Sequence, residues 1–289
     1  MAAVARIGGD TERVRRLAAG DGTLLAYRSY LAEGGTRGTV VYLHGIQSHG
    51  AWYLETASEL VRRGYSVCLP DRRGSGRSGG PRGHFPSTAR LVDDVRRIVE
   101  LARSEDEDAP LFIVGGCWGA RTAIAYALEE PEALAGLALV CPALFAKVDL
   151  PPPDKLRVLA GGVVAPMQPI RVPLEDELFT DNPPYLEFIK RDALSLREVT
   201  ASFFFRQAIW DRGLREATDL RLPVLVLQSG GDPIVDGTRV RAWFDRLESE
   251  RKRYVLYPEW GHLIDFEDER QRYWDDLAGW LDELAPVRS

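Results

Sequence analysis

Short apolar runs alternate with longer amphipathic segments along most of the chain. Runs such as TVVYL, LFIVGG and VLVLQ are almost continuously apolar, which is typical of strands covered by helices on both faces. In the segment Thr88–Arg103, Leu91, Val95, Ile98 and Leu101 recur at helical spacing. The alternation predicts βαβ units and an α/β fold with a mostly parallel central sheet flanked by helices.

The predicted elements follow directly from this pattern. The expected strands are Leu24–Tyr30, Thr39–Leu43, Ser66–Leu69, Leu111–Val114, Gly136–Cys141, Val224–Gln228 and Arg253–Tyr257. The expected helices are Trp52–Arg63, Thr88–Arg103, Ala120–Glu129, Val240–Leu247 and Gln271–Leu284. The residues before the first strand are expected to add an antiparallel edge.

One segment interrupts the alternation. Residues 146–213 are punctuated by proline, helical in character and without a convincing strand. Connections of this length are usually functional insertions or lids. We therefore predict a core domain made of residues 1–145 and 214–289, and a helical cap inserted at residues 146–213.

Cys117 stands in the turn Gly115-Gly-Cys-Trp-Gly-Ala120, between a predicted strand and a predicted helix. The turn matches the nucleophile elbow Gly-x-Nuc-x-Gly, in which glycines allow backbones to approach closely. The positive end of the following helix favours a thiolate. We interpret Cys117 as the nucleophile; the alternative is a small, inert, buried cysteine.

His262 and Asp232 follow Cys117 in the chain order nucleophile, acid, base. His262 comes just after the last predicted strand and is the predicted base. Asp232 follows strand Val224–Gln228, where a carboxylate can accept the Nδ1–H of the imidazole. Asp236 is the alternative acid, but its place at the start of the next helix indicates an N-cap.

The segment Leu43-His-Gly-Ile46 follows an apolar strand and supplies a further part of the predicted site. Acyl transfer needs two donors directed at the developing oxyanion. The predicted donors are the backbone N–H groups of Ile46 and Trp118. His44 is expected to hold this loop by hydrogen bonds.

These motifs together resemble one known superfamily. The segments that carry the resemblance are LHGIQSHGAWY, PDRRGSGRSGG, GGCWGARTAIAYA, LVCPAL, SGGDPIVD and EWGHLIDFE. The sequence is similar to the α/β-hydrolase superfamily and, within it, to the lysophospholipase and monoacylglycerol lipase-like branch. The resemblance implies the α/β-hydrolase fold and a carboxylic-ester hydrolase with a lid over an acyl pocket, and Cys117 stands where serine is usual.

A cysteine nucleophile leaves several functions open. Its acyl-enzyme is a thioester, which transfers to water and also to amines and thiols. The favoured prediction is a hydrolase of esters, thioesters or lactones, and the alternative is an acyltransferase or cyclising enzyme with a non-water acceptor. A ligand-binding protein that retains the fold without turnover is a third hypothesis. A cysteine introduced into a serine enzyme as an acyl trap would hold the same position.

The loop Asp71–Ser78 gathers several arginines among glycines and serines. One interpretation is an anion contact through Arg72, Arg73 or Arg77. The other, which we favour, is a loop fixed by hydrogen bonds of Asp71.

Composition restricts the partners. A net charge of −6 over 289 residues argues against nucleic-acid binding. Three scattered cysteines suggest neither a disulfide framework nor a metal cluster, and Cys68 and Cys141 end apolar runs as core residues do. We expect no metal, no organic cofactor, no transmembrane segment and no secretory signal. The predicted partner is a small-molecule acyl substrate and the predicted location is the cytoplasm; the oligomeric state is left open.

Overall fold

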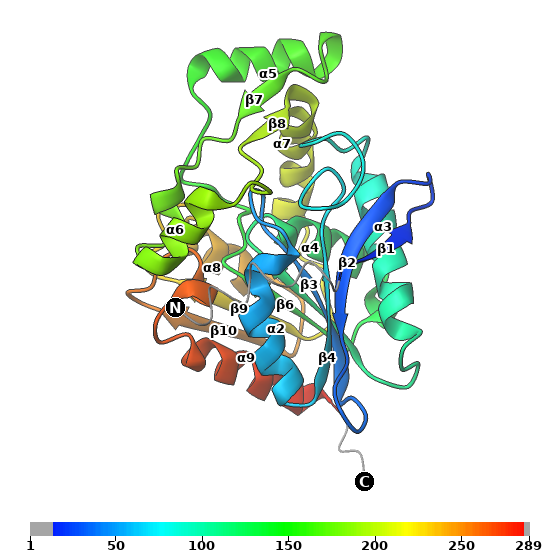
Figure 1. Cartoon of the computed structure of the whole chain (residues 1–289). Coiled ribbons are helices and arrows are strands. Elements are labelled where there is room, and N and C mark those ends of the chain that lie inside the picture. Colours follow the sequence, from blue (N-terminus) through cyan, green and yellow to red (C-terminus); the bar gives the residue numbers. More distant parts are fainter. Residues whose placement is uncertain (1–13, 286–289) are drawn as a thin grey trace.

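The computed structural model describes residues 14–285. An eight-stranded sheet runs through it in the order β1-β2-β4-β3-β5-β6-β9-β10 (Figure 1). The strands are β1 (Arg15–Ala18), β2 (Leu24–Tyr30), β3 (Gly38–Leu43), β4 (Tyr65–Pro70), β5 (Leu111–Gly116), β6 (Gly136–Val140), β9 (Val224–Ser229) and β10 (Lys252–Tyr257). β2 pairs antiparallel with β1 and β4, and the other neighbours are parallel. The predicted α/β-hydrolase fold class and the antiparallel edge are confirmed.

Helices cover both faces of the sheet. They are α2 (Leu54–Arg62), α3 (Thr88–Arg103), α4 (Gly119–Glu129), α8 (Gly237–Asp245) and α9 (Gln271–Leu284). The ring of Phe112 on β5 lies 6.2 Å from that of Trp280 on α9, whereas Gly115 of the same strand faces Ala120 and Ala123 of α4. Because positions 112 and 115 point to opposite faces of a strand, α9 and α4 pack on opposite sides. This explains why β3, β5 and β9 are buried along their whole length.

The long insertion lies between β6 and β9 in the chain, and most of it forms the top of Figure 1. It contains α5 (Pro152–Val164), β7 (Pro169–Arg171), α6 (Pro183–Arg191), β8 (Glu198–Thr200) and α7 (Ala201–Glu216). Short 3-10 helices occur at Gly50–Tyr53, Pro131–Ala133, Asp176–Leu178 and Ile264–Phe266. The expectation of an insertion without strands was wrong, because β7 and β8 pair antiparallel. Strands of three residues are too short to show a period-two pattern. The boundaries of the cap at 146–213 stay a prediction.

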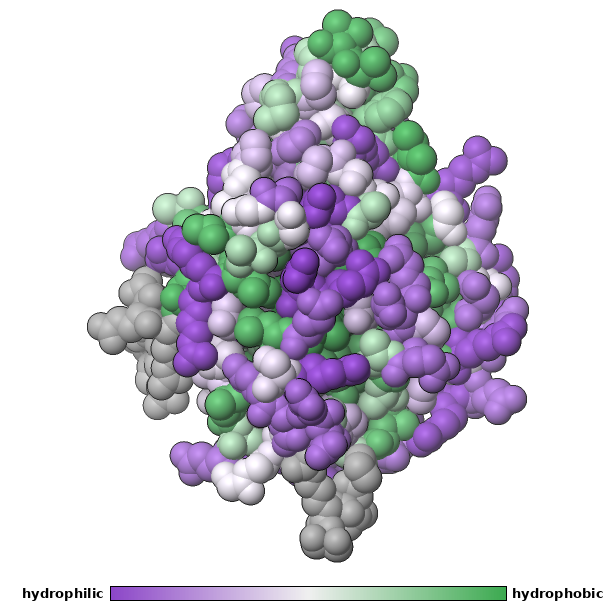
Figure 2. Space-filling model, turned by 90° about the vertical axis from the view of Figure 1, so that its right-hand side faces the viewer, coloured by the Kyte–Doolittle hydropathy of each residue, from purple (hydrophilic) through white to green (hydrophobic). Residues whose placement is uncertain are grey.

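The outer end of the insertion is apolar. Figure 2 shows hydrophobic side chains gathered over α5, where Leu156, Leu159, Val163 and Val164 are exposed. Within residues 14–285, no helix combines the length and apolar character needed to cross a membrane.

Candidate active site

Cys117 occupies a strained turn between β5 and α4. Its φ of +50° lies in the left-handed region, which is unusual for a residue with a side chain. The turn depends on glycine, because a Cβ at Gly119 would collide with the carbonyl oxygens of Leu43 and His44. A Cβ at Gly115 would lie 2.9 Å from Cα of Ala120. The elbow therefore requires glycine at position 119 to pack against the end of β3, and at position 115 to pack against α4.

The predicted base and acid meet inside the protein. Nδ1 of His262 lies 2.8 Å from Oδ2 of Asp232, and both side chains are buried. Oδ1 of Asp232 accepts the N–H groups of Ile234 at 2.8 Å and Val235 at 2.9 Å. Asp236 instead caps α8 by accepting the N–H of Arg239 at 3.1 Å, so its reading as an N-cap is confirmed.

The electrostatics couple Cys117 to this pair. Burial raises the pKa of the Cys117 thiol, but the imidazole of His262 more than offsets this effect. The pKa of the thiol therefore falls below its ordinary value. Burial lowers the pKa of His262, but Asp232 and then Cys117 raise it, with a net result of about 10. Burial raises the pKa of Asp232, and His262 more than reverses this effect. The three groups therefore favour a thiolate, an imidazolium and a carboxylate.

The loop after β3 lies directly against the cysteine. A Cβ on Gly45 would be 3.2 Å from Cβ of Cys117 and 3.5 Å from its Sγ. Within residues 14–285, the backbone N–H groups of Ile46 and Trp118 donate no hydrogen bond to another backbone group. Their role as oxyanion donors stays a prediction.

His44 holds this loop, as expected. Its Nδ1 donates to the carbonyl oxygen of Gly45 at 2.8 Å, and its Nε2 accepts the N–H of Arg72 at 2.8 Å. Burial holds the pKa of His44 well below its usual range. The ring is therefore neutral, as its acceptor nitrogen requires.

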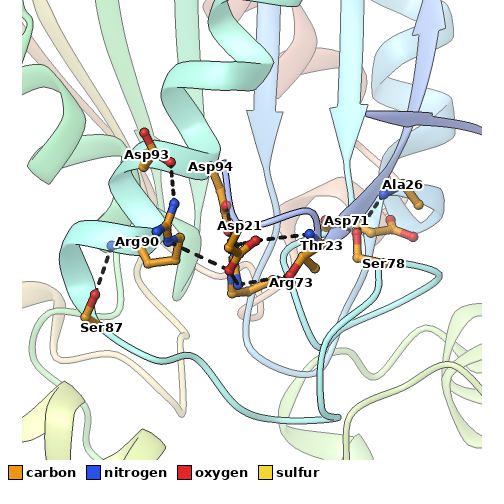
Figure 3. A network of polar contacts seen from close by, with 10 residues as sticks. All are labelled: Asp21, Thr23, Ala26, Asp71, Arg73, Ser78, Ser87, Arg90, Asp93 and Asp94. Carbon is orange, nitrogen blue, oxygen red and sulfur yellow. Dashed lines mark hydrogen bonds and ion pairs between the residues drawn. The ribbon is translucent and has the colours of Figure 1, made fainter. Parts of the chain in front are cut away.

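The loop Asp71–Ser78 is fixed from several directions (Figure 3). Oδ1 of Asp71 accepts the N–H of Gly50, and Oδ2 accepts the N–H of Arg77, both at 2.8 Å. Arg73 points toward Asp94 and Asp21 and pairs with them at 2.5 and 2.9 Å. Because Arg73 is occupied by two carboxylates, the interpretation of a hydrogen-bonded loop fits better than an anion site there.

Sequence reasoning missed the position of Cys141. This residue is buried and has a φ of +43°, and its sulfur lies within 4.8 Å of ligand atoms of Asp232 and His262. In the described part of the chain this is the group whose composition would suit a metal ion. Asp232 and His262 are hydrogen-bonded to each other, and their grouping with Cys117 in a triad stays a prediction. One feature of the sequence could have indicated this position: Cys141 directly follows β6, which lies beside β5 in the sheet, and β5 leads into Cys117.

The insertion covers the site. Cys117 is 5% exposed and His262 is 1% exposed. The ring of Phe203 on α7 lies 5.2 Å from that of Trp118, and Phe179 lies 5.9 Å from His262. One aromatic side chain of the insertion therefore contacts Trp118, the residue after Cys117, and another contacts His262.

A polar contact also ties the insertion to the loop beyond Ile46. Nε2 of His49 lies 3.0 Å from Oδ2 of Asp192, which also accepts Nε1–H of Trp52 at 2.7 Å. His49 is buried, and this contact joins the loop that carries it to the insertion.

The fold and the geometry of the elbow define an α/β hydrolase of the esterase and lipase type. Residues 34–269 match the family described as serine aminopeptidase, S33, and the chain belongs to this family. The family description names a serine enzyme, whereas this chain has Cys117 at the elbow.

Individual relatives agree with this assignment. The chain is 26% identical over 265 residues to a monoacylglycerol lipase of Mycolicibacterium smegmatis, covering 90% of this chain and 93% of the relative. It is 26% identical over 247 residues to the phospholipase YtpA of Bacillus subtilis, covering 84% and 95%. The structure of a monoacylglycerol lipase from Paleococcus ferrophilus superposes with a TM-score of 0.80 at 23% identity, covering 90% of this chain and 99% of the other. This last likeness supports the fold alone.

Proposed function

We propose that the protein hydrolyses carboxylic esters, thioesters or lactones through a Cys117-His262-Asp232 triad and a thioester acyl-enzyme. The observation that carries the proposal is geometric: Cys117 stands at a strained elbow with a φ of +50°, and the buried carboxylate of Asp232 holds Nδ1 of His262 at 2.8 Å. The lowering of the Cys117 pKa by His262 agrees with this arrangement. A nucleophile is activated by a base that a third group, here a carboxylate, holds in the correct orientation.

The proposed reaction has two halves. The Cys117 thiolate attacks the carbonyl carbon, and the π electrons move to the oxygen, which the N–H groups of Ile46 and Trp118 bind. Collapse of this intermediate re-forms the carbonyl and breaks the bond to the alcohol or thiol, which takes its proton from Nε2 of His262. Water then gives a proton to the same nitrogen and attacks the thioester, which releases the carboxylic acid and the thiolate.

Acylglycerols are the first natural substrates to test, because relatives over most of the chain bear the names monoacylglycerol lipase and phospholipase. The aromatic residues of the insertion that contact Trp118 and His262, Phe203 and Phe179, suit an apolar acyl chain. We propose a small lipid or other acyl ester as the substrate class.

The test is the intact mass of the protein after brief exposure to p-nitrophenyl esters and acyl thioesters. We expect steady release of p-nitrophenol and a transient acyl adduct, both lost in Cys117→Ala. Cys117→Ser is the matched variant: if it turns over much faster than cysteine, the cysteine acts as a trap. An unmodified Cys117 across the whole panel would overturn the proposal.

One observation favours acyl transfer as a second candidate. The nucleophile is only 5% exposed beneath the insertion, and a site closed to water lengthens the lifetime of a thioester. An adduct that persists in buffer and clears on addition of amines or thiols would support transfer; an adduct that clears in buffer alone would exclude it.

A further inference from the structure

Arg72 contacts the loop that carries the first oxyanion donor. Nη1 donates to the carbonyl oxygen of Gly45 and Nη2 to that of Ile46, each at 3.1 Å. The carbonyl of Gly45 and the N–H of Ile46 belong to one peptide group and point in opposite directions. A donor on that carbonyl therefore fixes the direction of the Ile46 N–H and polarises it.

The same guanidinium lies over the residue that carries the second donor. Its central carbon is 4.5 Å from the ring centroid of Trp118, a distance at which a cation and an indole attract each other. Nε1 of Trp118 also donates to Oε1 of Gln207 at 2.8 Å. Arg72 thus contacts both segments that carry the proposed oxyanion donors.

Within residues 14–285, no carboxylate lies within ion-pair distance of the Arg72 guanidinium. Its neighbour Arg73 pairs with Asp94 and Asp21 (Figure 3). Burial lowers the pKa of Arg72 to about 9, and placing an unpaired cation in partly buried surroundings costs free energy. A cation placed at that cost is expected where negative charge develops during a reaction.

The backbone of Arg72 is itself held in place. Its N–H donates to Nε2 of His44 at 2.8 Å, and the flanking residues Asp71 and Arg73 are fixed by hydrogen bonds and ion pairs. The guanidinium is therefore anchored at its own main chain and directed at Gly45, Ile46 and Trp118.

We propose that Arg72 is the positioning residue of the oxyanion site, orienting the Ile46 and Trp118 amides together and placing a positive charge behind them. This inference rests on the proposed function, because it assigns Arg72 a role in the acyl transition state. It predicts a specific difference between two reactions of Cys117. Alkylation by iodoacetamide forms no oxyanion, whereas acylation by an ester does.

The experiment compares Arg72→Met and Arg72→Lys with the wild-type protein, measuring the alkylation rate with iodoacetamide and the acylation rate with p-nitrophenyl acetate. We expect Arg72→Met to lower acylation on the order of 10²-fold, as for loss of an oxyanion donor, with kcat falling and KM little changed. Because the charges of Arg72 and Cys117 attract each other, alkylation is compared at a pH where the thiol is fully ionised in every variant, and there its rate should stay close to that of the wild type. Arg72→Lys keeps the charge but cannot hold two carbonyls and stack as a plane, so it should recover only part of the acylation rate.

Arg77→Met is the matched control, because Arg77 lies in the same loop with an exposed side chain and should leave both rates unchanged. If Arg72→Met acylates at the wild-type rate, or if its alkylation falls in parallel with acylation, the positioning role is overturned. If Arg72→Met does not fold, Arg72→Lys supplies the same comparison. A wild-type protein that is alkylated but that no ester acylates overturns the proposed function, and with it the role of Arg72.

Discussion

Asp232 and His262 are joined by a contact of 2.8 Å between Oδ2 and Nδ1, and the other oxygen of Asp232 is bound by two backbone N–H groups. The carboxylate is therefore held in one orientation, and it selects the tautomer of His262 that carries hydrogen on Nδ1. Nε2 is left for exchange of a proton with the nucleophile and the leaving group.

Replacing the acid tests this arrangement. Asp232→Asn should lower kcat by on the order of 10²- to 10⁴-fold, because the amide no longer selects the tautomer or stabilises the imidazolium. Asp236→Asn should retain turnover, since Asp236 only caps α8 and asparagine is also a good cap. Steady-state hydrolysis of a p-nitrophenyl ester measures both. Equal activity in Asp232→Asn and the wild type would remove Asp232 from the triad.

The titration of Cys117 gives a second prediction. Iodoacetamide labelling of Cys117 should show a midpoint below about 8.5, the value of a free thiol, because His262 lowers its pKa. In His262→Ala the midpoint should move above that value, since burial alone raises the pKa of the thiol. Mass spectrometry of labelled peptides checks this.

The other two cysteines are internal controls for that measurement. Burial raises the pKa of both Cys68 and Cys141, so both should stay unlabelled over the same pH range. Labelling of Cys117 no faster than of Cys141 would contradict the coupling to His262.

Substitution of the elbow glycine should destabilise the fold. In Gly119→Ala the new Cβ would meet the carbonyl oxygens of Leu43 and His44, which belong to backbone that cannot move aside. We expect a loss of at least about 3 kcal/mol in the free energy of unfolding, the upper part of the range for overpacking. Gly279→Ala, a helical site in α9 with nothing within 4 Å, should instead stabilise by about 1 kcal/mol. Urea unfolding of both variants separates the two effects.

Asp265 predicts a pH dependence of stability. Burial raises its pKa to about 6, although Thr56 and Tyr42 donate to it and act in the opposite direction. The folded state keeps this proton up to about pH 6, whereas the unfolded state loses it near pH 4. The contribution of Asp265 to the free energy of unfolding therefore falls as pH rises from about 4 to 6. A shift of two pKa units corresponds to a loss of about 3 kcal/mol in that free energy.

Asp265→Asn isolates that contribution. Its free energy of unfolding, measured by urea titration at several pH values, should differ from that of the wild type by an amount that changes between pH 4 and 6. A difference that is constant with pH would show that Asp265 ionises normally in the folded protein.

The local pattern of the sequence determined much of the fold. Helices α3 and α9 begin and end at the predicted residues, and the predicted strands lie within a residue or two of the observed ones. Buried apolar runs and helical spacing are properties of neighbouring residues, so they can be read along the chain. The elbow around Cys117 could also be predicted from the sequence, because a tight strand-to-helix turn needs glycine at fixed positions next to the nucleophile.

The sequence indicated the pairing of Asp232 with His262, but only the tertiary structure decided several other contacts around the site. The positions of Cys141 beside Asp232 and of Arg72 between Gly45 and Trp118 depend on the order of strands in the sheet. The burial of His49 against Asp192 depends on how the insertion folds back over the core. These contacts join residues far apart in the chain, and no local pattern of hydrophobic and polar positions encodes them; they follow from the packing of the whole domain.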